Sequence, residues 1–253
     1  MISFLFGETV YRPIYNFLIF IYNIIPLHDF GIAIIVVTLV LKFLLIPLSK
    51  KQIQSQKKMQ EMQPKIKEIQ EKHKNDKEKQ SRALMEFYKT NKTNPFSGCL
   101  PTIFQLIFLI AIYQVLFNIS KAGLLVDPKE LYSFISNPGQ INQYFLGIID
   151  LSKTIDFSQL NIRVVPQIIL IVLAALAQYV QIKMMIPKMA VQNKNAQPDM
   201  SQIMSKQMMY LGPILTLFIG IKFPAGLALY WLVSTIFAII QQTKVLEKEK
   251  TNS

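Results

Sequence analysis

The chain has 253 residues, of which 51% are hydrophobic, and its formal net charge is +12 at pH 7. Its apolar residues form blocks long enough to cross the roughly 30 Å hydrocarbon core of a bilayer, which argues against a soluble domain. The lysines lie between these blocks, so membrane topology explains them better than nucleic-acid binding does. We therefore expect a helical membrane protein with no direct nucleic-acid specificity.

Disulfide, metal and cofactor chemistry have little support in the sequence. The single cysteine, Cys99, excludes an internal disulfide, and His28 and His73 are too few to complete a metal site with it. There is no glycine-rich phosphate loop, no HExxH zinc motif and no Gly-x-Ser-x-Gly nucleophile motif. We predict a protein that is not an enzyme and that uses no metal and no cofactor. The first residues lack positive charge, so we also expect no cleaved signal peptide.

Residues 1–29 contain a short apolar run that prolines bound and asparagines interrupt. We interpret residues 9–27 as an amphipathic helix in the outer membrane interface. Its tyrosines, Tyr11, Tyr15 and Tyr22, would then lie at headgroup level. The alternative is a sixth membrane span, which would place the N-terminus on the inside.

Five later blocks are long enough to be membrane-spanning helices. They cover residues 30–48, 98–118, 164–186, 207–221 and 225–242. The last two blocks are separated by three residues, so we expect a tight antiparallel hairpin with Pro224 at its turn. The long connections are residues 49–97 and 119–163.

Lysine and arginine are distributed unequally between these two connections. From Lys50 to Lys92 there are thirteen Lys/Arg and six Asp/Glu, whereas from Lys121 to Asp156 there are three and four. The positive-inside rule therefore places the first connection in the cytoplasm and the second outside. With five spans, the N-terminus lies outside, while the loop 187–206 and the tail 243–253 are cytoplasmic. The composition, without a transit peptide, favours the bacterial plasma (inner) membrane.

Residues 49–97 have helical periodicity but no spanning potential. Apolar residues recur at steps of three and four before a polar turn at residues 74–77, and a second, shorter stripe follows it. This pattern predicts an antiparallel cytoplasmic hairpin that moves relative to the spans, with a solvated charged linker as the alternative. Methionines gather around the loop 187–206, where flexible thioethers suit varied apolar partners or simply fill a core.

Lys42 lies within the first predicted span, one helical turn after Thr38 and on the same face. A lysine at the centre of a span costs about 2.5 to 3.5 kcal/mol, so we expect it to face protein or water. Snorkelling is the alternative, because Lys50 follows after about 12 Å of helix. Other polar residues within spans are Gln105, Gln114, Gln178, Gln181, Tyr230, Ser234 and Thr235. Each alone could make an ordinary interhelical hydrogen bond, but together with Lys42 they predict a hydrated pocket.

A set of motifs resembles the YidC-type membrane protein insertases, which are related to mitochondrial oxidase-assembly and chloroplast albino-type insertases. The motifs are Thr38-Leu-Val-Leu-Lys42 with Pro47, Gln63-Pro64-Lys65-Ile66, Asn94-Pro95, Gly98-Cys99-Leu100-Pro101 with Gln105, and Phe223-Pro224-Ala225-Gly226-Leu227 with Leu229-Tyr230-Trp231. Their order and spacing fit over roughly residues 8 to 245.

The resemblance implies an all-α integral membrane protein whose five spans enclose a hydrophilic groove, open to the cytoplasm and to lipid but closed to the outside. Lys42 stands where the family usually carries an arginine as its groove cation, with Thr38, Gln181 and Trp231 at matching positions. Ile107 replaces a proline that the family usually has in its second span. We expect neither a large domain before the first span nor a long ribosome-binding tail.

We therefore predict an insertase that captures nascent membrane proteins and inserts them into the lipid bilayer through this groove. The predicted groove residues are Lys42, Thr38, Gln105, Gln178, Gln181, Tyr230, Trp231 and Ser234, and the predicted cytoplasmic capture residues are Met59, Met62, Ile66, Met185 and Met204. Further partners implied are the Sec translocon and the ribosome. The alternatives are a ribosome- or translocon-associated assembly factor without insertion activity, and a small-solute transporter.

Overall fold

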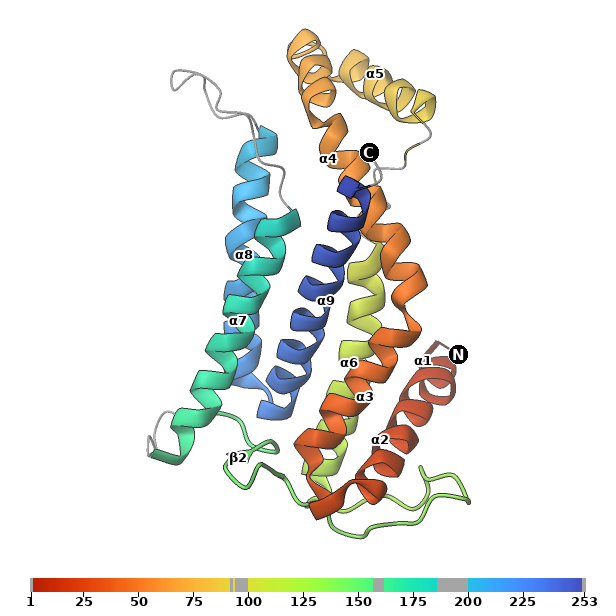
Figure 1. The fold of residues 1–253 in the computed structure, drawn as a ribbon, viewed down its shortest axis with the longest axis vertical. Helices are drawn as coiled ribbons and strands as arrows, with labels where there is room; N and C mark the ends of the chain where they lie inside the picture. Colours follow the sequence, from red (N-terminus) through yellow and green to blue (C-terminus); the bar gives the residue numbers. More distant parts are fainter. Residues whose placement is uncertain (1, 92, 94–99, 157–161, 186–199, 252–253) are drawn as a thin grey trace.

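The computed structural model describes residues 2–91, 93, 100–156, 162–185 and 200–251, which are mostly helical (Figure 1). The helices are α1 (Ile2–Phe6), α2 (Arg12–Ile24), α3 (Phe30–Leu44), α4 (Ile46–Lys72), α5 (Lys77–Thr90), α6 (Leu100–Lys121), α7 (Val165–Met185), α8 (Met200–Lys222) and α9 (Ala225–Thr251). A π-helical turn, Gly7–Tyr11, joins α1 to α2, and 3-10 turns cover Pro26–His28 and Ile162–Val164. Two short antiparallel strands, β1 (Tyr144–Phe145) and β2 (Ile149–Asp150), lie between α6 and α7.

Helix α9 lies at the centre of the bundle, with α7 and α8 on one side and α3 and α6 on the other (Figure 1). Helices α4 and α5 project together from one end of the molecule, which we call the hairpin end. The connection between α6 and α7 covers the opposite end, which we call the loop end. The C-terminus lies at the hairpin end, and the N-terminus lies about midway along the bundle.

Two segments of the described chain, Ile162–Met185 and Ala225–Glu247, are long and apolar enough to cross a membrane. Helices α3 and α4 together would form a third candidate, although their axes differ by 65°. Shorter apolar helices cover Leu106–Lys121 and Met209–Lys222. The chain is thus a mostly helical membrane protein, and the number of five spans stays a prediction.

The break between α3 and α4 falls at Leu45, whose backbone leaves the helical region (φ −89°, ψ 1°). Pro47 occupies the first turn of α4, where its missing N–H costs no helical hydrogen bond. The sequence pattern predicted one span over residues 30–48, whereas the helix changes direction within it. The distance of about 12 Å from Lys42 to Lys50, which assumes a straight helix, therefore does not apply.

The tyrosines of the N-terminal helices are buried within the protein, and their depth at headgroup level stays a prediction. Tyr11, Tyr15 and Tyr22 are 8%, 2% and 2% exposed. Their hydroxyls accept hydrogen bonds, at 2.9 to 3.0 Å, from the Asn118 side chain and from the N–H groups of Asp127 and Asn142, respectively. The polar face of α2 thus binds the loop end of the protein itself.

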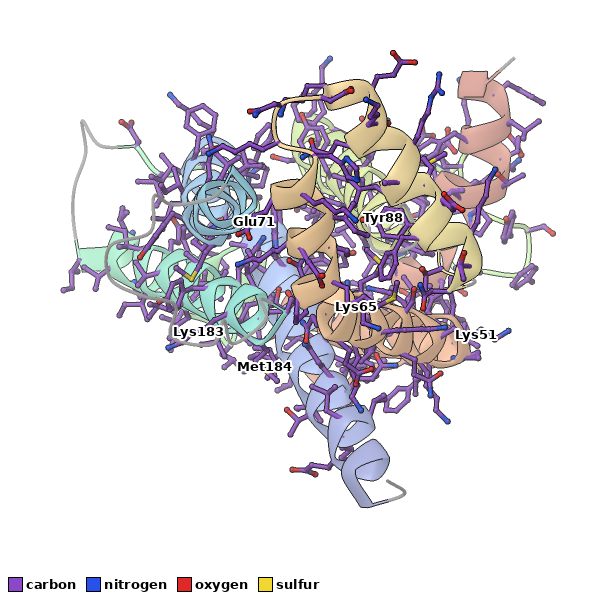
Figure 2. All side chains as sticks on the ribbon, turned by 90° about the horizontal axis from the view of Figure 1, so that it is seen from above. Lys51, Lys65, Glu71, Tyr88, Lys183 and Met184 are labelled. Atoms are coloured by element: carbon purple, nitrogen blue, oxygen red, sulfur yellow. The ribbon has the colours of Figure 1, made fainter. Side chains whose placement is uncertain are left out.

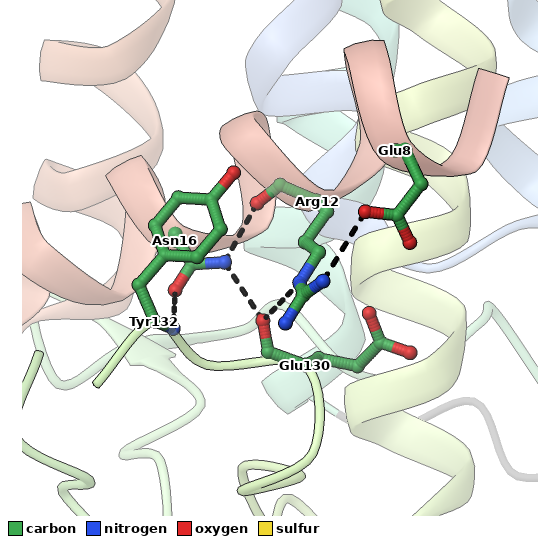
Figure 3. A network of polar contacts seen from close by, with 5 residues as sticks. All are labelled: Glu8, Arg12, Asn16, Glu130 and Tyr132. Atoms are coloured by element: carbon green, nitrogen blue, oxygen red, sulfur yellow. Dashed lines mark hydrogen bonds and ion pairs between the residues drawn. The ribbon is translucent and has the colours of Figure 1, made fainter. Parts of the chain in front are cut away.

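Asn16 joins α2 to the connection between α6 and α7 (Figure 3). Its Nδ2 donates to the carbonyl oxygens of Arg12 and Glu130, both at 2.8 Å, and its Oδ1 accepts from the N–H of Tyr132 at 2.6 Å. Asn16 itself is 1% exposed, so these bonds satisfy a side-chain amide that water does not reach.

The same connection covers the ends of two bundle helices. Asp29 caps the first turn of α3 with one carboxylate oxygen and accepts from the N–H of Leu146 with the other, at 2.7 Å. The N–H of Gly226, at the start of α9, donates to the carbonyl of Leu151 at 3.0 Å. These bonds satisfy helix N-terminal donors that would otherwise need water.

Candidate functional site

Lys42 lies in the last turn of α3, on the face that the helix turns towards the rest of the protein. The buried residues of this helix are Phe30, Gly31, Ala33, Ile34, Val37 and Thr38. Lys42 follows Thr38 by one turn and is half-buried, whereas Phe43 and Leu44 are 59% and 70% exposed. The lysine stem therefore continues the protein-facing side of α3.

Helices α3 and α9 run side by side in the same direction, and two contacts fix their register (Figure 1). A Cβ on Gly226 would lie 3.4 Å from Cδ1 of Ile34. About three turns further on, the rings of Phe43 and Phe237 meet edge-on with centroids 5.1 Å apart. Lys42 is consequently level with the stretch of α9 just before Phe237.

Several predicted groove residues lie between these two contacts. Helix α3 contributes Thr38 and Lys42, and α9 contributes Tyr230, Trp231 and Ser234. Tyr230 and Ser234 are buried and joined by a side-chain hydrogen bond, and Trp231 is partly buried. The hydroxyl of Thr38 donates to the carbonyl of Ile34 at 2.6 Å, so its own helix satisfies its proton.

Gln178 lies at the contact between α7 and α8. Its Oε1 accepts from the hydroxyl of Thr216 at 2.7 Å, and its Nε2 would lie 3.3 Å from a Cβ on Gly212. Gln178 thus makes an ordinary interhelical hydrogen bond, as lone polar residues in apolar helices often do. Thr216, which is 2% exposed, was not singled out from the sequence, although a threonine within an apolar block is a signal. Gln181, one turn towards the hairpin end, is partly exposed.

At the hairpin end, α4 packs against α7 and α9. Gln60 donates from Nε2 to the backbone carbonyl of Met185. A small cavity nearby is lined by Ile53, Gln56, Lys57, Gln60, Met184, Gln242 and Leu246. In Figure 2, which looks down on this end, Lys183 and Met184 lie at the end of α7 and Lys65 lies on α4. The base of the hairpin is thus held against the bundle.

The predicted capture residues differ in their exposure. Met62 and Ile66 are buried, at 9% and 5% exposure, and Met59 and Met185 are partly exposed. The side chains of Gln105 and Met204 lie outside the described part of the structure, as do residues 187–199 of the predicted methionine-rich loop.

A second polar space lies at the loop end, away from Lys42. This cavity has a volume of about 130 Å³ and is lined by Tyr11, Tyr15, Asn118, Ile119, Ala122, Leu125, Asp127 and Glu130. Neither it nor the cavity at the hairpin end is lined by Lys42 or Thr38. Among the described residues, no three His, Cys, Asp or Glu side chains gather where they could hold a metal ion.

Comparisons with known proteins point to one family. The model of the family described as 60Kd inner membrane protein matches residues 20–252. A protein of Geotalea uraniireducens named membrane protein insertase YidC is 35% identical over 245 residues, which are 96% of this chain and 38% of the relative. Proteins of the same name are 36% identical in Shewanella halifaxensis (91% of this chain, 35% of the relative) and 32% identical in Fusobacterium nucleatum (94% and 98%). The chain thus spans little more than a third of two relatives and nearly all of the third.

Proposed function

Because this chain belongs to the 60Kd inner membrane protein family, we propose that it inserts nascent membrane proteins into the lipid bilayer, as its relatives' name, membrane protein insertase, states for them. The family match over residues 20–252 carries this proposal. The Fusobacterium relative, which has nearly the same extent, supports it. Insertion moves a polypeptide from water into the bilayer without changing any covalent bond, so the proposed activity requires no cofactor.

In the proposed arrangement, five spans of a bacterial inner membrane are supplied by α3 together with the start of α4 as far as Leu48, and by α6, α7, α8 and α9. The hairpin end lies in the cytoplasm and the loop end lies outside. The N-terminus is predicted to face the outside as well, although α1 lies about midway along the bundle (Figure 1). The excess of Lys/Arg between residues 50 and 92 supports this orientation. The groove is a trough between α3, α9 and α7 that opens to the cytoplasm and to lipid, so it is not an enclosed cavity.

Lys42 is the proposed groove cation. The difficult step of insertion is the passage of a polar, often acidic, N-terminal segment through hydrocarbon. An ammonium group in the trough would attract a carboxylate by about 4 kcal/mol at 4 Å in an effective dielectric near 20. The attraction stays modest, so the segment is released and its apolar helix moves sideways into lipid. The half-buried position of Lys42 on the protein side of α3 supports this role.

Gln181 and Trp231, which are partly exposed, would provide polar groups along the same trough, together with Gln105. Tyr230 and Ser234 are buried, so they would reach the trough only if α9 separates from its neighbours. Capture would begin at the hairpin end, where Met59 and Met185 are partly exposed. Capture by Met62 and Ile66 requires α4 to separate from the elements that bury them. The Sec translocon and the ribosome are proposed as partners at this end.

Purified protein in liposomes tests the proposal, with a small single-span substrate whose translocated segment is acidic. We expect insertion by the wild type and by Lys42→Arg, and markedly less by Lys42→Ala. Lys51→Ala, an exposed lysine of α4, is the matched control and should insert normally. If the wild type binds the substrate without inserting it, the protein is an assembly factor instead, and solute flux through the liposomes would indicate a transporter.

A further inference from the structure

Large apolar side chains are exposed at the loop end, beside the end of α2. The loop-end patch, as we name it, consists of Ile24, Leu27, Phe134, Leu146 and Ile148, whose exposed fractions lie between 60% and 90%. It continues the exposed side of α2, because Phe20, one turn before Ile24, is 44% exposed. Such a concentration of exposed apolar residues marks an interaction surface.

Hydrogen bonds hold the parts of this patch together. The side chain of Asn23, next to Ile24, donates to the carbonyl of Ser136 at 2.7 Å, which fixes the segment that carries Phe134. Asp29, two residues after Leu27, accepts from the N–H of Leu146 at 2.7 Å. The patch is therefore a surface of the folded protein, formed where the α2–α3 turn meets the connection between α6 and α7.

Two of its leucines have a backbone conformation that favours glycine or asparagine. Leu27 has φ +70° and Leu146 has φ +53°. Leu146 and Gly147 are the two central residues of a turn after β1, which is closed by the N–H of Ile148 on the carbonyl of Phe145 at 3.0 Å. A turn with positive φ at both central residues usually carries Asn-Gly. Leucine is unfavourable there, and because it is 63% exposed it recovers little of that cost by packing within the chain.

The surrounding sequence indicates what covers the patch. Residues 131–149 contain no Asp, Glu, Lys or Arg, although 17% of the whole chain is charged. The same segment holds Tyr132, Phe134, Tyr144 and Phe145, and the rings of Tyr132 and Phe134 stack with centroids 5.6 Å apart. Tyrosine is enriched at the boundary between headgroups and acyl chains, and charged residues are unfavourable in the acyl region. A charged protein partner would find no complementary charge in this segment.

We propose that the loop-end patch inserts into the headgroup–acyl boundary of the membrane and anchors the loop end at a fixed depth. Lipid then provides the apolar environment that the exposed leucines lack within the chain, and the exposed side of α2 continues the same lipid-facing surface. This anchoring goes beyond the proposed insertion activity and holds for either orientation of the protein in the bilayer. Its failure would leave the insertase proposal intact.

Nitroxide labels on single cysteines test the anchor in the full chain with Cys99→Ser, reconstituted in phosphatidylethanolamine and phosphatidylglycerol vesicles. Labels at Phe134→Cys and Leu146→Cys should collide severalfold more with oxygen, which dissolves in lipid, than with a water-soluble nickel chelate. Labels at Lys129→Cys and Lys153→Cys, exposed charged positions of the same connection, should show the reverse preference. Equal nickel accessibility at all four positions would overturn the proposal. Protection of the patch labels from both reagents would also overturn it, because protein would then cover the patch.

Leu146→Asn separates anchoring from folding. Asparagine tolerates the left-handed backbone better than leucine, so the melting temperature in detergent should stay the same or rise. In vesicles, a label at Ile148→Cys should move towards water, with a severalfold gain in nickel collisions relative to the parent. An unchanged label depth with Leu146→Asn would contradict the anchoring role of this leucine.

Discussion

Asn16→Leu should loosen the connection between α6 and α7 from the bundle. The change removes the acceptor of the Tyr132 N–H, at 2.6 Å, and the donor to the Glu130 carbonyl, at 2.8 Å. Leaving this part-buried N–H without an acceptor costs about 1 to 3 kcal/mol, and losing the second bond costs about 1 kcal/mol. Leucine has a similar shape to asparagine, so the apolar packing of α2 should survive. We expect a local loss of about 2 to 4 kcal/mol.

Amide hydrogen exchange measures this loss directly, because the Tyr132 N–H is itself a probe. A loss of about 2 to 4 kcal/mol corresponds to exchange about 30 to 1,000 times faster in the peptide that contains Tyr132. Asn23→Ala is the matched control: it removes one hydrogen bond, to Ser136, at a more exposed position, and should have a much smaller effect. Equal exchange rates for Asn16→Leu and Asn23→Ala would refute the importance of the three-bond arrangement.

Two further predictions concern other parts of the fold. Gly31→Ala places a methyl group 2.3 Å from the Phe145 ring and should destabilise the protein by about 1 to 3 kcal/mol in thermal unfolding, whereas Gly7→Ala, which meets no atom within 4 Å, should be neutral or stabilising. At the start of α5, the Asp76 carboxylate accepts from the Lys79 N–H at 3.0 Å, and this bond lowers the carboxyl pKa. The hydrogen bond of Asp76 stabilises α5 fully at a pH above the pKa that Asp76 has in the unfolded chain. This stabilisation is lost as the pH falls through the lower pKa that Asp76 has in the folded protein. Amide exchange in α5, corrected for intrinsic rates, should show this acid loss in the wild type and not in Asp76→Asn.

The sequence predicts where the helices lie along the chain, but it does not predict which residues their side chains contact. The predicted spans 207–221 and 225–242 lie within α8 and α9, and the polar turn at residues 74–77 separates α4 from α5. Periodicity, however, gives only the direction of a side chain. The tyrosines of α2 have the pattern of an interfacial helix, but they bind the backbone of a connection more than 100 residues away. Pairing over such a separation leaves no local signal.

The candidate site illustrates the same limit. The four-residue step from Thr38 to Lys42 predicts a shared face, and both do follow the buried side of α3. A glutamine in an apolar helix does not reveal its partner, so the bond of Gln178 to Thr216 on α8 could not be foreseen. The bend at Leu45 had a usable signal in Pro47, which favours the first turn of a new helix.

Lys42 is proposed to lie in water within the membrane, and the reactivity of a thiol at this position measures its contact with water. In liposomes, Lys42→Cys and Phe43→Cys would each be made with Cys99→Ser and exposed to a membrane-impermeant maleimide on the hairpin side. Thiols react as thiolates, which form in contact with water and not in hydrocarbon. We expect fast labelling of Lys42→Cys and little labelling of Phe43→Cys, which lies on the exposed side of α3. Equal resistance of both cysteines to the reagent would contradict it.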